Sequence, residues 1–107
     1  MAIARTWSCR ADPKDPDAYP QHFKDKVLPE LDAIPGFLGA MLMRREDAGQ
    51  VEYTVITRWI SMDSIKKFAG DNVDEAVVSP EVIAALTSYD KTVKHSEILE
   101  KVWSTTR

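Results

Sequence analysis

The apolar residues of this chain follow two different spacings in turn, and the order of those spacings restricts the fold. A spacing of two, typical of a strand, runs from Ile3 to Arg10. Spacings of three and four, typical of a helix, follow from about Ala18 to Ile34. Two strand-like segments, residues 37–46 and 51–59, are then joined by the turn residues Asp47-Ala48-Gly49. This half of the chain therefore predicts a strand, a helix and a β-hairpin.

The second half contains two helix-start signals and one further strand. Ser61 can cap a helix that Gly70 can end. Ser79-Pro80 predicts a short helix that presents Val82, Ile83 and Leu86 and closes near Tyr89. Residues 92–102 alternate like a last strand. In the first half, Pro29 falls inside the apolar stripe of the helix and predicts a kink or a new short turn there.

The predicted order is βαββαβ, the split βαβ arrangement, so we expect an α+β, ferredoxin-like fold. Such a fold has a four-stranded antiparallel sheet with its helices on one face. The chain has 107 residues, 44% of them hydrophobic and 29% charged, which suits a single domain over residues 1–107.

Bulk charge and composition exclude several classes of function. The net charge is −3, and no Lys or Arg cluster exceeds Arg44-Arg45 or Lys66-Lys67, so we expect no nucleic-acid partner. No apolar run approaches the ~20 residues of a membrane span, so we expect no membrane contact and a cytoplasmic location. Cys9 is the only cysteine, which leaves neither an internal disulfide nor a cysteine zinc site.

The segment 37–43 is apolar on both faces, which predicts a partner. Alternation places Phe37, Met41 and Met43 against Leu38, Ala40 and Leu42. Helices of a split βαβ unit cover one face only, and an open antiparallel face should be polar. We therefore expect a second copy of the chain on the other face, a homodimer. The alternative is that residues 73–78 and the C-terminal tail cover that face.

Three stretches of sequence carry a resemblance to a known family. They are Ala4-Arg5-Thr6-Trp7, Ile34-Pro35-Gly36-Phe37-Leu38-Gly39-Ala40 and Val55-Ile56-Thr57-Arg58-Trp59-Ile60-Ser61. The chain resembles the antibiotic biosynthesis monooxygenase-like (ABM) family of dimeric α/β barrels. That resemblance implies a ferredoxin-like dimer. It also implies an activity among cofactor-independent oxygenases of aromatic polyketides, haem-degrading enzymes and small proteins without an assigned role.

The haem-degrading branch of that family is the less similar one. It uses an Asn on the first strand, a Trp on the second helix and a His shortly after. Phe68 stands at the Trp position here, and Val77 or Val78 stands near the His position. Because these side chains have no nitrogen lone pair for iron, they argue against haem ligation. His95 with Glu97 offers two metal ligands where three are normally required, so we expect no metal site, and we expect no cofactor.

Candidate site residues come from the strands and the second helix. His95 is the predicted acid–base group, oriented by Glu97, and Trp7 accompanies it as the second catalytic candidate. His22 is expected to be solvated. The candidates for binding a small hydrophobic molecule are Arg5, Met41, Tyr53, Arg58, Trp59, Phe68 and Tyr89.

Three functions remain open from the sequence. The first is a cofactor-independent monooxygenase that acts on a small hydrophobic aromatic or quinone-like compound. The second is a non-catalytic dimeric module that binds a small apolar ligand. The third is a relative of the proteins that bind or degrade haem.

Overall fold

A five-stranded antiparallel sheet forms the body of the protein, which we describe from a computed structural model covering residues 2–102 and 104. The strands are β1 (Ile3–Ala11), β2 (Phe37–Asp47), β3 (Gln50–Trp59), β4 (Leu86–Tyr89) and β5 (Lys94–Glu97). Their order is β2-β3-β1-β4, and β5 also pairs with β1. The short strands β4 and β5 thus share the position of the fourth strand.

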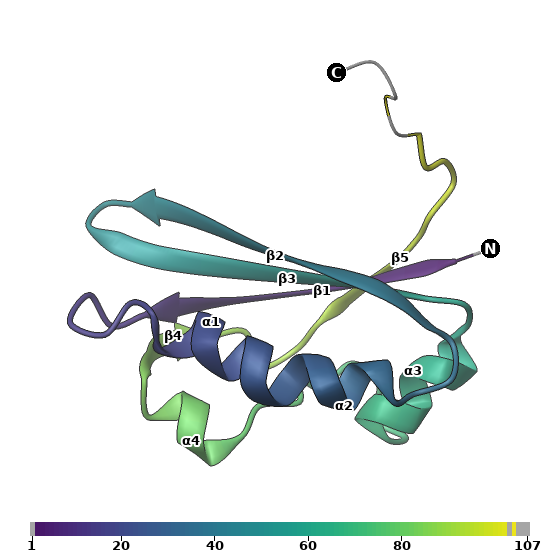
Figure 1. Cartoon of the computed structure of the whole chain (residues 1–107), viewed down its shortest axis with the longest axis horizontal. Helices are drawn as coiled ribbons and strands as arrows, with labels where there is room; N and C mark the ends of the chain where they lie inside the picture. Colours follow the sequence, from purple (N-terminus) through teal and green to yellow (C-terminus); the bar gives the residue numbers. More distant parts are fainter. Residues whose placement is uncertain (1, 103, 105–107) are drawn as a thin grey trace.

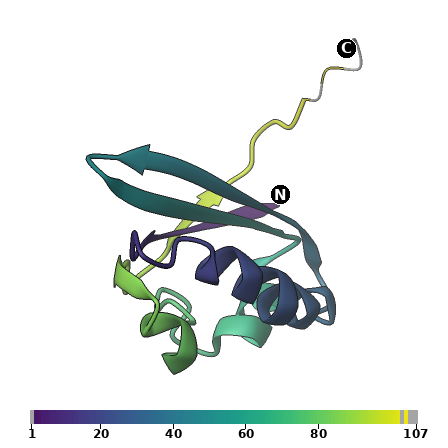
Figure 2. The same ribbon diagram turned by 60° about the vertical axis from the view of Figure 1, so that its left-hand side comes forward.

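All the helices lie on one face of this sheet (Figures 1 and 2). They are α1 (Ala18–His22), the π-helix η1 (Phe23–Val27), α2 (Leu28–Asp32), α3 (Met62–Ala69) and α4 (Pro80–Ile83). This arrangement confirms the predicted α+β, ferredoxin-like fold class. None of the described helices is long and apolar enough to cross a membrane.

The first helical segment is interrupted next to Pro29, as its sequence predicts. The backbone N–H of Leu28 donates to the carbonyl of Phe23, five residues earlier, so the chain widens into a π-turn before α2 begins. Pro29 lies at the start of α2, directly after the widened turn, and because it has no backbone N–H it cannot donate to the preceding turn. The widened turn keeps Tyr19, Phe23 and Leu31 all facing the sheet as buried residues.

The start of α3 is fixed by its own residues and by the turn before β2. Ser61 caps α3 by accepting from the backbone N–H of Ser64, whose hydroxyl in turn accepts from the N–H of Ser61. Gly36 passes against this cap: a Cβ there would lie 2.5 Å from the Cβ of Ser64, and its φ is +98°. Gly36 therefore permits a close approach that no other residue would allow.

The C-terminal part differs from the sequence prediction. Leu86–Tyr89 is strand β4, not part of the preceding helix, because Tyr89 and Leu86 pair with Cys9 and Ala11 of β1. The last strand is also shorter than residues 92–102. In β5, Glu97 pairs with Ile3, the first residue of β1, so the chain beyond has no strand left to pair with.

A β-bulge in β2 corrects the predicted division of that strand into two faces. Phe37 pairs with Trp59 but Gly39 pairs with Arg58, so Leu38 is an extra residue. As a result Phe37 joins Ala40 and Leu42 on the helix side. Leu38, Met41 and Met43 lie on the outer side, where each is more than 40% exposed.

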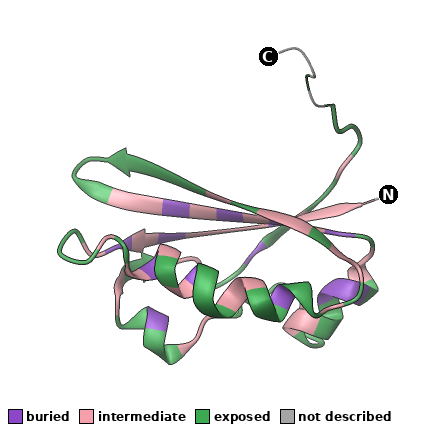
Figure 3. Ribbon diagram, viewed as in Figure 1, coloured by how far each residue is buried: buried purple, intermediate pink, exposed green. Residues whose placement is uncertain are grey.

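Two clusters make up the core between sheet and helices (Figure 3). The larger one centres on Cys9, Tyr19, Phe23, Tyr53 and Val55. The second consists of Leu31, Trp59 and Ile65, with Phe37 and Phe68 packed against it. The helix-side face is therefore filled at both ends, and the space between the two clusters holds the site described next.

Candidate functional site

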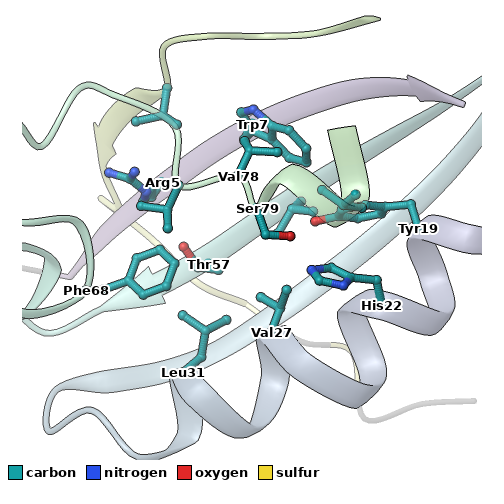
Figure 4. A pocket seen from close by; sticks show the side chains of 14 residues that line it. Arg5, Trp7, Tyr19, His22, Val27, Leu31, Thr57, Phe68, Val78 and Ser79 are labelled. Atoms are coloured by element: carbon teal, nitrogen blue, oxygen red, sulfur yellow. The ribbon is translucent and has the colours of Figure 1, made fainter. Parts of the chain in front are cut away.

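A cavity lies between the two core clusters, enclosed by the sheet, by the helical segment Ala18–Asp32 and by the segment 77–82 (Figure 4). We call it the inner cavity. Its walls are mainly apolar, and its lining residues are Arg5, Trp7, Tyr19, His22, Val27, Leu31, Val55, Thr57, Phe68, Val77, Val78, Ser79, Val82 and Val93. Such a composition, apolar with a few polar groups, is typical of a small-molecule site.

The inner cavity has a free volume of about 60 Å³ and opens into a second space. On the same measure one water needs about 10–15 Å³, so the inner cavity holds more than a single water. The second space, the outer groove, has about 270 Å³ and adds Lys26, Glu30 and Glu81 to the lining. The two spaces share His22, Val27, Phe68, Val77 and Ser79, which we call the throat.

Arg5 joins the cavity wall to the loop that follows α3. It is only 5% exposed, and its guanidinium donates to the carbonyl of Val73 and, at 2.8 Å, to that of Glu75. Its Cζ also lies 5.9 Å from the centre of the Phe68 ring. Burial lowers the pKa of Arg5, but the three donor contacts, the third being to His95, keep the cation paired. Arg5 therefore ties residues 73–75 to the sheet.

His95 lies behind Arg5, outside the inner cavity. Its Nε2 is 3.0 Å from Nη1 of Arg5, and its Nδ1 is 3.4 Å from Oδ1 of Asp74. Because a guanidinium can only donate, Nε2 must accept, which places the proton of a neutral imidazole on Nδ1, toward Asp74. Burial and the nearby Arg5 charge lower the pKa of His95, and Asp74 opposes this only in part. His95 is thus a neutral link in an Arg5–His95–Asp74 network.

Trp7 and Tyr19 form the aromatic wall near α1. Their ring centroids are 5.5 Å apart, and the indole N–H of Trp7 donates to the carbonyl of Asp90 at 2.6 Å. With its only polar group satisfied, Trp7 offers the cavity an apolar face. Burial raises the pKa of Tyr19, so its hydroxyl stays protonated.

One polar residue at the throat, Ser79, stands out by its environment. Ser79 is the N-cap residue of α4, yet its side chain makes no capping bond. Its hydroxyl oxygen is buried and has no hydrogen-bond partner. A buried hydroxyl without a partner costs about 1–3 kcal/mol. Figure 4 shows this hydroxyl pointing toward the end of the cavity where His22 and Tyr19 lie.

The structure brings three of the predicted site residues together at the inner cavity, namely Arg5, Trp7 and Phe68. The others lie elsewhere. Met41 and Arg58 are on the outer face of the sheet. Tyr53 and Trp59 are buried in the two core clusters, where the Tyr53 hydroxyl donates to the carbonyl of Pro16 at 2.6 Å. Tyr89, in β4, borders a shallow surface depression with Asp90.

Sequence reasoning missed His22, Tyr19 and Ser79 as lining residues. His22 was expected to be solvated, but it is half-buried at the throat. Its spacing of three from Tyr19 could have signalled this, since residues three apart share a helix face. Ser79 carried a helix-start signal, and no pattern in the sequence shows that its hydroxyl turns away from the helix into the cavity.

The geometry defines a class of protein: a ferredoxin-like α+β domain with a small apolar cavity between its sheet and helices. The family model for antibiotic biosynthesis monooxygenase matches residues 3–72. The chain belongs to the antibiotic biosynthesis monooxygenase family.

Solved structures give the same fold at low sequence identity. A protein from Bacillus cereus, provisionally assigned as an antibiotic biosynthesis monooxygenase, has 13% identity and a TM-score of 0.68, and the match covers 100% of both chains. A similarly assigned protein from Caulobacter crescentus has 17% identity and a TM-score of 0.67, over 92% of this chain and 91% of that chain.

The haem-degrading protein of Mycobacterium tuberculosis has 18% identity and a TM-score of 0.65, over 96% of this chain and 100% of that chain. No curated protein matches the chain by sequence. At such identities these structures support the fold alone.

Proposed function

We propose that the inner cavity and the outer groove together bind a small phenolic aromatic compound and that the protein oxidises it with dioxygen, as a monooxygenase without a cofactor. The observation that carries this proposal is the cavity itself. It is lined by Trp7, Phe68 and aliphatic side chains, and its deep polar groups Arg5 and Trp7 are already paired with backbone carbonyls. An aromatic ring bound there is shielded from water, which favours reaction of its anion with oxygen over side reactions.

The proposed reaction converts a phenol and O₂ into a quinone and water. The phenolic proton leaves first, and the resulting anion supplies the electrons that reduce O₂ while a C–O bond forms at a ring carbon. The peroxide anion formed in this way takes up the released proton and becomes a ring hydroperoxide. Loss of water from this hydroperoxide breaks its O–O bond and the adjacent C–H bond, which leaves one oxygen atom in the quinone. The substrate is thus the reductant, and the protein needs to supply only a proton acceptor and a dry pocket.

His22 is the imidazole that lines the inner cavity, so we assign it as the proton acceptor in place of His95. Both nitrogens of His95 are held, one by Arg5 and one by Asp74. We therefore propose His95 as a positioning residue, which acts by holding Arg5 and the loop at residues 73–75. Trp7 and Phe68 would contact the aromatic ring of the ligand.

Non-catalytic ligand binding is the second candidate function. One observation favours it: the hydrogen bonds of Arg5, Trp7 and His95 are all made within the protein, so these groups need no further partner. In that case the protein would retain a small apolar molecule without changing it. The same cavity would serve either function.

Haem fits the described residues poorly. Phe68 and Val77 stand where the resemblance places the Trp and the His of the haem-degrading branch, and neither can ligate iron. His22 lines the same throat, and we assign its imidazole to proton transfer. Among the described residues no group of three or more His, Cys, Asp and Glu could hold a metal ion. We therefore propose no step through haem.

We also propose that the protein acts as a homodimer, in the cytoplasm. On the outer face of the sheet, which no described helix covers, Leu38, Met41 and Met43 are 45%, 45% and 42% exposed. Leu99 and Val102 in the C-terminal segment are exposed as well. A second copy that packs its own outer face here would remove these side chains from water, as two-fold symmetry allows.

Oxygen consumption tests the enzymatic proposal. We would incubate the protein with 1-naphthol and larger phenolic polycycles, with and without air. We expect O₂ uptake and a quinone product, with one labelled oxygen atom in the quinone when ¹⁸O₂ is supplied. Two labelled atoms in the product would contradict monooxygenation. Retention of the compounds without any O₂ uptake would favour the binding module.

A cavity-filling variant separates catalysis in the cavity from background oxidation. Val78 lines the cavity, so Val78→Phe should abolish O₂ uptake by occupying the space of the ligand ring. Ile60→Phe adds the same ring at a position that is 60% exposed, and it should leave the rate unchanged. Equal rates in the two variants would place the reaction outside the cavity.

A further inference from the structure

The throat between the inner cavity and the outer groove contains two polar side chains, Ser79 and His22, among its five residues. The other three are Val27, Phe68 and Val77. A ligand that occupies both spaces passes between these five residues, so part of it lies next to Ser79 and His22. An apolar atom there would leave the buried hydroxyl of Ser79 without a partner, whereas an oxygen atom would satisfy it.

The chemistry of the surrounding groups points to a ligand oxygen. The Ser79 hydroxyl can donate or accept, and so can the two nitrogens of an imidazole such as His22. Tyr19 lines the same cavity, and its ring centroid is 6.3 Å from that of His22. Figure 4 shows Tyr19 and His22 at one end of the cavity and Arg5 at the other, with the hydroxyl of Ser79, which lies between them, pointing toward Tyr19 and His22.

We propose that Ser79, His22 and Tyr19 form a polar site that binds one hydroxyl or carbonyl oxygen of the ligand at the throat. The site rests on the proposed function, because it presupposes an aromatic ring bound in the inner cavity and the outer groove. It adds the orientation of that ring: the oxygenated edge lies beside Ser79 and His22, and the unsubstituted edge points toward Arg5. The protein should therefore select ligands with an oxygen at one edge over apolar ligands of the same shape.

A matched pair of probes tests this selection, measured by titration calorimetry with 1-naphthol and with 1-methylnaphthalene. A hydroxyl and a methyl group are similar in size, so the difference in affinity isolates the polar contact. We expect the wild-type protein to prefer 1-naphthol. In Ser79→Ala that preference should fall by about 2- to 12-fold, the range of one neutral hydrogen bond, with the affinity for 1-methylnaphthalene unchanged.

Three further variants make the test specific. Ser79→Thr keeps the hydroxyl and should retain the preference, and His22→Phe should reduce it. Ser96→Ala removes a hydroxyl from an exposed residue of β5 and should change neither affinity. The melting temperature of each variant shows that it is folded.

The possible failures are distinguishable. Equal binding of both probes by the wild-type protein would overturn the polar site and leave the cavity as a ligand site. An unchanged preference in Ser79→Ala and His22→Phe would do the same. If the wild-type protein bound neither probe, the proposed function would fail, and the polar site with it.

Discussion

The two faces of the sheet differ in how far the single chain covers their apolar side chains. On the helix side Trp59 and Tyr53 are 0% and 1% exposed, and Arg5 has partners for its donors. On the outer side Met41 remains 45% exposed, and the Nε atom of Arg58 is buried without a partner. One chain thus completes one face only, and the difference locates the cavity on one side and the proposed dimer contact on the other.

Of the changes that test the difference between the two faces, introducing charge on the outer face should have the largest effect, because it should prevent dimerisation. Met41→Lys combined with Met43→Lys would place four charges in a two-fold interface, where unpaired charges cost several kcal/mol. We expect sedimentation equilibrium to change from about twice the 12.1 kDa chain mass to that mass itself. Far-UV circular dichroism should stay the same, because both side chains are exposed in the single chain.

A control variant adds the same charges away from the outer face. Gln21→Lys with Gln50→Lys alters two exposed residues and should leave the mass of the assembly unchanged. A wild-type protein that sediments as a 12.1 kDa particle at micromolar concentration would remove the dimer from the proposal.

Two arginines on opposite faces give the next largest effect. Arg5→Met would leave the carbonyls of Val73 and Glu75 without their donor, so we expect a loss of about 3 kcal/mol in the free energy of unfolding. Arg58→Met removes a buried Nε that has no partner, and it should change stability by no more than about 0.5 kcal/mol.

Urea unfolding would measure both, in the charged outer-face variant so that dimer contacts do not contribute. Equal losses in the two variants would show that the internal network of Arg5 adds nothing to stability.

The pH dependence of stability should be the smallest effect, and it sharpens the role of the helix-side network. The pKa of His95 is lowered in the folded protein, chiefly by burial and then by Arg5. Below about pH 6.5 the unfolded chain therefore binds a proton more readily than the folded one. The contribution of His95 to the free energy of unfolding should thus be constant above that pH and fall as the pH drops below it.

The glutamine in His95→Gln cannot titrate but can still accept a hydrogen bond from Arg5, so this variant should lose less unfolding free energy at low pH than the wild-type protein. The control variant Ser96→Ala, at a neighbouring exposed residue, should lose as much as the wild-type protein. Urea unfolding at pH 7.5 and 5.0 gives the comparison, and the same slope in His95→Gln as in the wild-type protein would assign the pH dependence to other groups.

The fold was largely predictable because its signals are local. The cap at Ser61, the end at Gly70 and the break beside Pro29 each depend on residues within one or two helical turns. The fourth strand position was harder. Strand β4 (Leu86–Tyr89) has only four residues, and it pairs with β1, which lies more than seventy positions earlier in the sequence. A short helix and a short strand cannot be told apart from such a segment alone.

The candidate site was less predictable than the fold. Aromatic residues at core spacing were candidates as a group, yet Trp59 and Tyr53 fill the core while Trp7 and Phe68 line the cavity. The side-chain type is the same in both roles, so composition could not separate them. His95 had the right chemistry, but the pairing of β5 with β1 places it beside Arg5, where both its nitrogens are held.

The sequence by itself determined the order of helices and strands as far as α4, the capping of α3 and the family, because spacing, caps and proline act over a few neighbouring residues. Only the tertiary structure decided which side chains meet at the cavity. The bulge at Leu38 sets the faces of β2, and the contacts of Arg5 join residues 68 and 70 positions apart. Such contacts depend on the packing of the whole chain, which no local pattern records.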